Sequence, residues 1–231
     1  MNHYKKGLNK YKSFAYRSLL NNEIQSFIDT FRTKLVIGNS NILFIHIPKC
    51  AGTSFSKALY GKQILHTTAK QYKKYFPKSF DKLFKFTIIR SPIDRALSAY
   101  NFIKSCGSSD VSIDYKIIYK SKAFDNFENF VKIFLSKQEN LYIDNIFRPQ
   151  SDFIFENNEQ ILDYVGLVDN LEEVLMMLRE KGYSVNLEHT NRQERPFFSQ
   201  SGISEELRKQ IISIYHSDWE LYKKIKDNEQ K

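Results

Sequence analysis

Two stretches of this chain run from a nearly continuous apolar segment straight into a polar turn that can start a helix. The first is "NILFIHIPKCAGTSFSKAL" (41–59), and the second is "FKFTIIRSPIDRALSAY" (84–100). A continuous apolar run rich in isoleucine is typical of a parallel strand that is buried on both faces. Strands alternating with helices predict an α/β domain whose ligand site lies at the carboxyl ends of the strands.

Further elements extend this alternation along the chain. We expect a third buried strand at 164–168, followed by a helix that ends before Gly182. Apolar spacing predicts more helices at 124–135 and from Ser204 to Tyr222. A chain of 231 residues is long enough for one sizeable core. The predicted fold is a single P-loop-type, three-layer α/β domain, in which helices flank a central, mainly parallel sheet.

The composition favours an anionic ligand. Lys and Arg exceed Asp and Glu by 35 − 26 = 9, so the surface should attract anions. Cys50 and Cys106 stand in unrelated contexts, which fits reduced thiols in a cytoplasmic protein. No His or Cys spacing is typical of a zinc site, so we expect no metal. We also find no secretory signal and no apolar stretch long enough to span a bilayer.

We divide the chain into an N-terminal extension (1–40) and a main domain (41–231). Residues 1–20 carry five cationic side chains and no acid, and apolar residues then follow at helical spacing. One interpretation is a helix packed on the domain behind a solvated basic lead-in. The other is a basic amphipathic element, within residues 1–35, that rests on an anionic membrane. The apolar positions are Leu20, Ile24, Phe27, Ile28, Phe31 and Leu35.

The turn after the first strand has the chemistry of an anion cradle. A helix that begins here presents unpaired N–H groups, and Lys49, Gly52 and Thr53 add a cation, close backbone approach and a hydroxyl. The loop of nucleotide triphosphatases instead places its Lys directly after a second Gly. Here Lys49 precedes the single Gly52, and Ile47 stands where a first Gly would be required. The kinase or ATPase loop is therefore not matched.

Together the two turns resemble those of sulfotransferases that use 3′-phosphoadenosine 5′-phosphosulfate (PAPS). "HIPKCAGTS" (46–54) is similar to the 5′-phosphosulfate loop of the carbohydrate sulfotransferase group, which contains the heparan 2-O-sulfotransferases and many bacterial members. "IIRSPIDRALSAYNF" (88–102) is similar to the same group's 3′-phosphate element. Weaker likeness extends over most of the chain from about residue 41, including "HTTAKQYKKYF" (66–76) and "YVGLVDNLEEVLMML" (164–178).

The resemblance implies roles for particular residues. Lys49 would stabilise the departing 5′-phosphate, and Arg90 with Ser98 would hold the 3′-phosphate. Arg192 lies in a basic stretch that would close over the nucleotide or form an ordinary solvated loop. Arg95 would support the same phosphate or pair with Asp94. The 5′-phosphate would be held by the loop residues Lys49, Cys50, Ala51, Gly52, Thr53 and Ser54.

The acceptor hydroxyl needs a general base, and His has a suitable pKa. His66 follows the apolar pair Ile64–Leu65, which we expect to end a short strand, and it opens the patch that resembles the family segment with a catalytic His. The alternatives are a capping or surface role for His66, with a carboxylate such as Asp152 as the base. His46 lies inside an apolar run and is expected to be a core residue.

Cys50 departs from the family pattern, because Thr is usual at this position. The change keeps the backbone donor and loses one hydroxyl. One interpretation is a tolerated small residue, and the other is a thiol whose pKa is lowered by the electropositive loop.

The leading hypothesis is PAPS-dependent sulfuryl transfer to a hydroxyl of a saccharide or lipid-linked sugar, in a bacterial cytoplasmic enzyme that binds no nucleic acid as substrate. Two other classes stay open. One is an ATP-dependent small-molecule kinase, which would need magnesium. The other is a non-catalytic protein that binds polyanions with a strong dependence on salt. The pattern does not fix the oligomeric state.

Overall fold

The computed structural model describes residues 22–105, 119–187 and 198–229. Its central sheet has three parallel strands in the order β1-β2-β5, so that β2 lies in the middle. All four residues of β1 are buried, as are the last four of β2. The α/β class with a parallel sheet is therefore confirmed. The strands are β1 (Ile42–Ile45), β2 (Phe84–Ile89) and β5 (Tyr164–Leu167).

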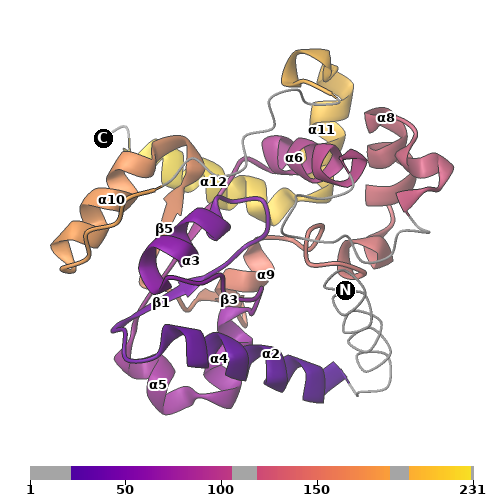
Figure 1. Ribbon diagram of the computed structural model, residues 1–231. Helices are drawn as coiled ribbons and strands as arrows, with labels where there is room; N and C mark the ends of the chain where they lie inside the picture. Colours follow the sequence, from indigo (N-terminus) through magenta and orange to yellow (C-terminus); the bar gives the residue numbers. More distant parts are fainter. Residues whose placement is uncertain (1–21, 106–118, 188–197, 230–231) are drawn as a thin grey trace, which may run out of the picture.

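Helices cover both faces of this sheet, as Figure 1 shows. Successive side chains of a strand point to opposite faces, so Ile42 and Phe44 pack on one side and Leu43 and Ile45 on the other. The first face is covered by α3 (Gly52–Tyr60) and α10 (Leu171–Glu180). The second is covered by α2 (Asn22–Ile37), α4 (Ala69–Tyr75), α5 (Pro77–Lys82), α9 (Ser151–Ile154) and α12 (His216–Glu229).

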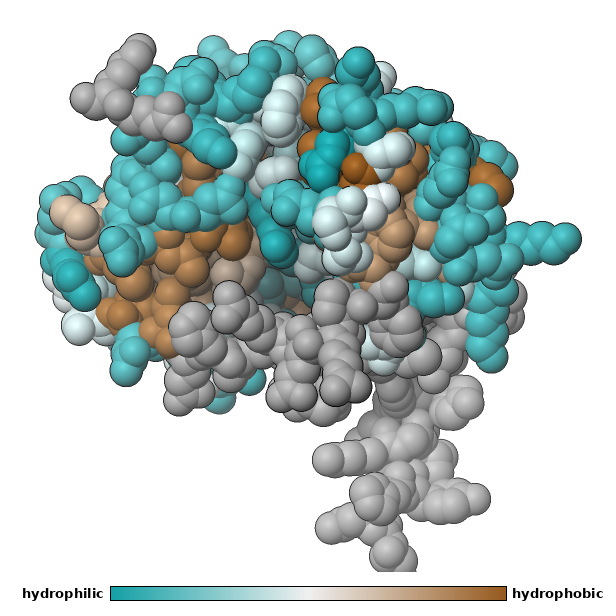
Figure 2. All heavy atoms as spheres, turned by 90° about the horizontal axis from the view of Figure 1, so that it is seen from above, coloured by the Kyte–Doolittle hydropathy of each residue, from teal (hydrophilic) through white to brown (hydrophobic). Residues whose placement is uncertain are grey.

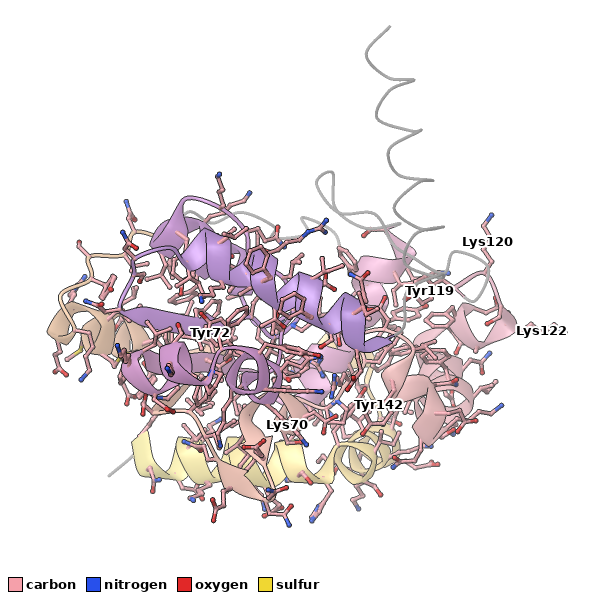
Figure 3. The ribbon with its side chains drawn as sticks, turned by 90° about the horizontal axis from the view of Figure 1, so that it is seen from below. Lys70, Tyr72, Tyr119, Lys120, Lys122 and Tyr142 are labelled. Carbon is pink, nitrogen blue, oxygen red and sulfur yellow. The ribbon has the colours of Figure 1, made fainter. Side chains whose placement is uncertain are left out.

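A separate cluster of helices packs beside the sheet around a third, phenylalanine-rich core. Tyr119 and Tyr142 belong to this part of the molecule, whereas Lys70 and Tyr72 come from α4 beneath the sheet (Figure 3). Its elements are α6 (Pro92–Lys104), η1 (Lys122–Phe124), α8 (Phe127–Asn129), the π-helical turn η2 (Phe130–Leu135), η3 (Gln138–Tyr142) and α11 (Glu205–Ile214). Short pieces complete the fold: the hairpin of β3 (Phe155–Glu156) and β4 (Glu159–Gln160), η4 (Val168–Asn170) and η5 (Gln200–Gly202).

The turn after β2 begins its helix as predicted. The Ser91 hydroxyl accepts a hydrogen bond from the Asp94 N–H at 3.5 Å, and Pro92 occupies the first helical position. Pro is favoured there because its missing N–H would have no helical partner. The carboxyl end of β2 is thus joined to α6 by a rigid turn.

Other local expectations were wrong. The single helix expected from Ser204 to Tyr222 is two helices, because Tyr215 leaves helical geometry and its hydroxyl donates to the Phe147 carbonyl at 2.8 Å. The helix expected at 124–135 is broken into η1, α8 and η2. Ile64 and Leu65 form no strand; the Ile64 carbonyl bonds the His46 ring instead. Between η1 and α8 the Asn126 side chain begins a new helix by accepting from the Asn129 N–H at 2.8 Å.

Candidate active site

The loop between β1 and α3 is tightly folded. Lys49 and Ala51 both have positive φ, at 68° and 58°, a conformation that is costly for residues with a side chain. The N–H groups of Ser54 and Phe55 bond the Ala51 carbonyl as α3 begins. The N–H groups of Gly52 and Thr53 precede them and lie at the positive end of the helix.

Gly52 is required by a neighbouring ring. A Cβ at this position would lie 1.8 Å from His46 Cδ2 and 2.3 Å from its Nε2. Sequence reasoning assigned this glycine to close approach of a ligand, whereas the structure places the imidazole of His46 against it. His46 is buried, as expected, and its Nδ1 lies 3.2 Å from the Ile64 carbonyl.

Lys49 and Arg90 bring the two predicted phosphate elements to one site. Lys49 is half-buried, with its Nζ 4.1 Å from the centre of the Phe102 ring on α6. Burial, and next the positive charge of Arg90, lower the pKa of Lys49 to about 8. No carboxylate of the described residues forms an ion pair with either side chain. Two neighbouring cations without a counter-charge form a site for an anion.

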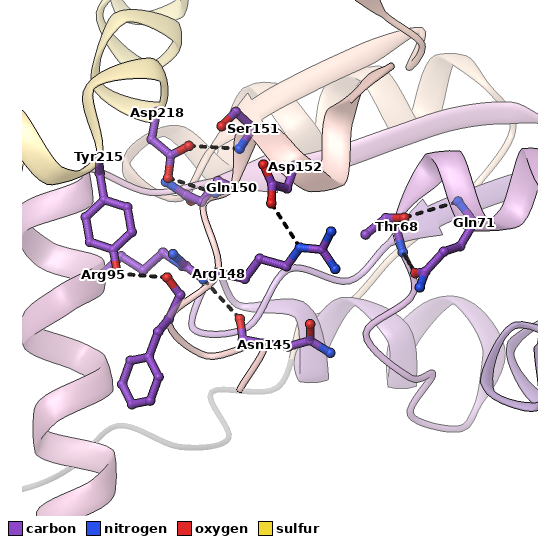
Figure 4. A network of polar contacts seen from close by, with 11 residues as sticks. Thr68, Gln71, Arg95, Asn145, Arg148, Gln150, Ser151, Asp152, Tyr215 and Asp218 are labelled. Atoms are coloured by element: carbon purple, nitrogen blue, oxygen red, sulfur yellow. Dashed lines mark hydrogen bonds and ion pairs between the residues drawn. The ribbon is translucent and has the colours of Figure 1, made fainter. Parts of the chain in front are cut away.

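Gln150 ties the two turns together. Its side-chain oxygen accepts from the Cys50 thiol at 3.1 Å and from the Arg90 N–H at 2.9 Å, and its amide donates to the Arg90 carbonyl at 2.9 Å. Its backbone N–H donates to Asp218 at 2.7 Å, and the N–H of Ser151 donates to the same carboxylate (Figure 4). Gln150 and Asp218 are both buried. Sequence reasoning missed both residues.

We expect Gln150→Leu to lower the free energy of unfolding by about 2–4 kcal/mol, because a buried polar group left without its partner costs about 1–3 kcal/mol. The substitution strands the N–H and carbonyl of Arg90 together with the Cys50 thiol. Urea denaturation measures the effect. The exposed Gln138→Leu is the matched control, expected to stay within about 0.5 kcal/mol of wild type. Equal stability of the two variants would contradict the role of Gln150.

Cys50 is a structural residue whose thiol donates to the side-chain oxygen of Gln150. Its side chain is buried, and burial raises the pKa of the thiol to about 11, against the lesser effects of Arg95 and Arg90. The interpretation of a thiol with a lowered pKa was therefore wrong. Burial overrides the electropositive loop because the thiolate loses its hydration.

The thiol of Cys50 should react slowly in the native protein. A pKa of about 11 in place of 9.0 lowers the thiolate fraction at pH 8 about 100-fold. In a Cys106→Ser variant, labelling by an aromatic disulfide reagent should be at least that much slower in buffer than in denaturing urea. Comparable rates in the two solvents would show that the thiolate is accessible.

Arg95 stabilises the loop between β1 and α3 through hydrogen bonds to backbone carbonyls. Its Nε donates to the Pro48 carbonyl at 3.1 Å. Its Nη2 donates to the Asn145 carbonyl at 3.4 Å (Figure 4). The side chain is buried and makes no ion pair with Asp94. Of the roles considered from sequence, pairing with Asp94 is excluded and a structural role at the phosphate loop is favoured.

His66 lies directly beside this loop, because its ring centre is 4.3 Å from that of His46. His66 Nδ1 is 3.0 Å from the His46 carbonyl oxygen. A carbonyl only accepts, so Nδ1 carries the hydrogen and Nε2 keeps a lone pair. Burial lowers the pKa of His66, and the charges of Arg95 and Lys49 act in the same direction. The ring is therefore neutral at pH 7 and able to take a proton.

One carboxylate acts on the His66 ring, and the carboxylate expected as the alternative base is engaged in an ion pair. Asp152, the alternative base, forms an ion pair with Arg148, with Oδ2 and Nε 3.1 Å apart. Asp144 acts on His66 and raises its pKa, and its Oδ2 accepts from the Tyr119 hydroxyl at 3.0 Å. Asp144 was missed from sequence because it lies in an irregular segment without a recognisable motif.

For the other predicted phosphate ligands, the structure gives the burial and the position on a helix. Thr53 and Ser54 are half-buried in the first turn of α3, and Ser98 is half-buried two turns into α6. Arg192 lies outside the described residues.

Within the described ranges, no group of three or more His, Cys, Asp or Glu side chains is arranged to hold a metal ion. No helix in the described part of the chain is long and apolar enough to cross a bilayer. Seen from above, the described surface is hollowed near its centre, where hydrophilic and apolar side chains meet (Figure 2).

Comparison with known proteins gives one family. The model of a family described as "Sulfotransferase family" matches residues 32–224, which is most of the chain. Neither the search of curated proteins nor that of solved structures finds a match.

Proposed function

Because this chain belongs to the sulfotransferase family, we propose that it transfers a sulfuryl group from PAPS to a hydroxyl of a saccharide or lipid-linked sugar. The observation that carries the proposal is the meeting of Lys49 and Arg90 beside the neutral ring of His66, two cations with no carboxylate partner among the described residues. A nucleotide with both a 5′-phosphosulfate and a 3′-phosphate supplies anions for both cations.

The proposed roles combine this geometry with the family resemblance. His66 Nε2 takes the proton of the acceptor hydroxyl as its oxygen attacks sulfur, and the bond from sulfur to the bridging oxygen breaks. The leaving group is 3′-phosphoadenosine 5′-phosphate, and Lys49 with the N–H groups of Gly52 and Thr53 neutralises its 5′-phosphate. Arg90 and Ser98 hold the 3′-phosphate. The family resemblance supports a saccharide as the acceptor. We also propose a cytoplasmic location, and a boundary between the N-terminal extension and the main domain at residues 40 and 41.

Nucleotide binding tests the proposal directly. We expect 3′-phosphoadenosine 5′-phosphate to bind at least about tenfold more tightly than AMP, because a hydrogen bond to a charged group contributes about 1.5–3 kcal/mol. Arg90→Ala should remove most of this preference while affecting AMP little, as measured by calorimetry. Equal affinity of the wild type for both nucleotides would overturn the proposal. Magnesium-dependent turnover of ATP would favour a kinase instead.

The pH dependence of kcat/KM should be bell-shaped. His66 must be neutral, so activity falls on the acid side, below a pKa that lies under 6.5. Lys49 must be charged, so activity falls on the alkaline side, above about pH 8. Initial rates between pH 5 and 10 measure both limbs. In Lys49→Arg the alkaline limb should vanish from this range, because a guanidinium stays charged. An unchanged limb in this variant would assign it to another group.

A further inference from the structure

Helix α2 is amphipathic, but hydroxyl side chains as well as apolar ones face the domain. Its inward face carries hydroxyls: Thr30 and Thr33 are fully or almost fully buried, and Thr33 Oγ1 lies 3.3 Å from the Thr67 hydroxyl. The Ser26 hydroxyl accepts from the Gln71 amide at 2.9 Å. These polar contacts join the helix to α4 and to the residues just before it, and Ile37 adds a buried apolar contact with the core. The helix therefore packs on the domain, as one of the two interpretations expected, and its basic lead-in lies outside the described residues.

Four large apolar side chains of α2 point outward. Residues 24, 27, 31 and 35 recur at helical spacing and so form one stripe along the helix. They supply four of the seven exposed large apolar side chains among the described residues. Their exposed fractions are Ile24 49%, Phe27 44%, Phe31 43% and Leu35 64%.

Aromatic side chains at the end of α4 widen this stripe. The ring centre of Phe27 is 5.4 Å from that of Tyr75 and 6.2 Å from that of Phe76, and Phe31 is 6.4 Å from Phe76. The result is a continuous apolar surface over two helices that lie side by side (Figure 3). We call residues 24, 27, 31 and 35 with Tyr75 and Phe76 the α2 surface.

Cations border the α2 surface. Lys34 Nζ lies 4.2 Å from the centre of the Phe76 ring, and Arg32 is exposed on the same helix. Lys74 lies over Tyr75 and also pairs with Glu23 at 2.7 Å, so its charge is balanced there. The sequence that leads into α2 adds five Lys and Arg and no acid over residues 1–20. An exposed apolar stripe next to excess positive charge is complementary to anionic lipid.

We infer that the α2 surface docks on an anionic lipid bilayer, with its Phe, Leu and Ile side chains at the acyl boundary and the neighbouring cations among the headgroups. The inference does not depend on the proposed reaction. Such docking would hold the enzyme at a membrane surface, where a lipid-linked acceptor is presented.

Vesicle co-sedimentation of the full chain tests this inference. Wild type should partition onto vesicles of phosphatidylcholine with phosphatidylserine at least about tenfold more strongly than onto phosphatidylcholine alone. Phe27→Ser with Phe31→Ser should lose at least about tenfold of that binding, whereas Phe27→Leu with Phe31→Leu should keep most of it. The control pair Ile133→Ser with Met176→Ser removes exposed apolar side chains from other helices and should bind like wild type.

Three outcomes would overturn the inference: no binding of wild type to anionic vesicles, equal binding of the serine pair, or a dimer of wild type in solution that the serine pair abolishes. Light scattering measures the oligomeric state. The thermal transition and nucleotide affinity of each variant show that it is folded. Because these readouts are separate from turnover, failure of the proposed reaction would leave this test intact.

Discussion

His66→Ala is expected to reduce sulfuryl transfer by about 10²–10⁴-fold, the usual contribution of a general base. Binding of 3′-phosphoadenosine 5′-phosphate should stay close to that of wild type, because His66 bonds the His46 carbonyl and is not assigned to either phosphate. Single-turnover transfer from labelled PAPS measures the chemical step, and calorimetry measures binding. The predicted signature is therefore a loss in kcat with little change in nucleotide affinity.

A second variant separates the base from the support that the ring gives to the loop. In His66→Asn the side-chain amide can replace Nδ1 as donor to the His46 carbonyl, but no lone pair replaces Nε2. We expect this variant to fold like wild type and to remain as inactive as His66→Ala. His216→Ala, at an exposed position on α12, is the matched control and should be fully active. Turnover at the wild-type rate in His66→Asn would rule out His66 as the base.

Lys49→Met is expected to lower kcat by about 10²–10³-fold, the usual effect of removing one group that stabilises developing charge. Methionine keeps an apolar stem against Phe102 and removes only the cation. Nucleotide affinity should also fall, by about tenfold or more, since a hydrogen bond to a charged group contributes about 1.5–3 kcal/mol. Steady-state rates and calorimetry measure the two effects.

The same substitution should stabilise the protein without ligand. Lys49 is held near Arg90 without a carboxylate, and burial lowers its pKa, so the charged ammonium destabilises the folded state. A higher melting temperature together with lower activity would identify Lys49 as a functional residue kept at a cost in stability. The exposed Lys62→Met is the control and should change neither property. A lower melting temperature with normal turnover would make Lys49 a structural residue.

The sequence predicted the elements that depend on neighbours along the chain. The three buried strands were visible as apolar runs, and the Ser91 cap was visible because a capping residue and its partner are three positions apart. Helix α2 was also predicted in place, but its orientation was not. Periodicity shows that a helix has an apolar face; it does not show whether that face meets the domain.

Some residues of the candidate site were likewise predictable from the sequence, and others were not. Lys49 was found from the local pattern of a strand-to-helix turn that suits an anion, and Arg90 was found from the resemblance. Gly52 was found as well, but the structure requires it beside the His46 ring. His66 was favoured by resemblance, and the structure adds the His46 carbonyl that leaves its Nε2 free. Asp144 and Gln150 were missed, since each acts through a residue far away in the chain.

The sequence by itself determined the parallel α/β fold and the two strand-to-helix turns, because apolar runs, caps and turn residues act over a few positions. Only the tertiary structure decided what Cys50 does. It lies 100 positions from Gln150, and their hydrogen bond forms because Asp218 and the Arg90 backbone hold Gln150 at the edge of the sheet where β1 and β2 both end. The residue that departs from the family pattern is therefore explained by a contact inside the protein, since burial keeps its thiol protonated and bonded to the glutamine that holds Arg90.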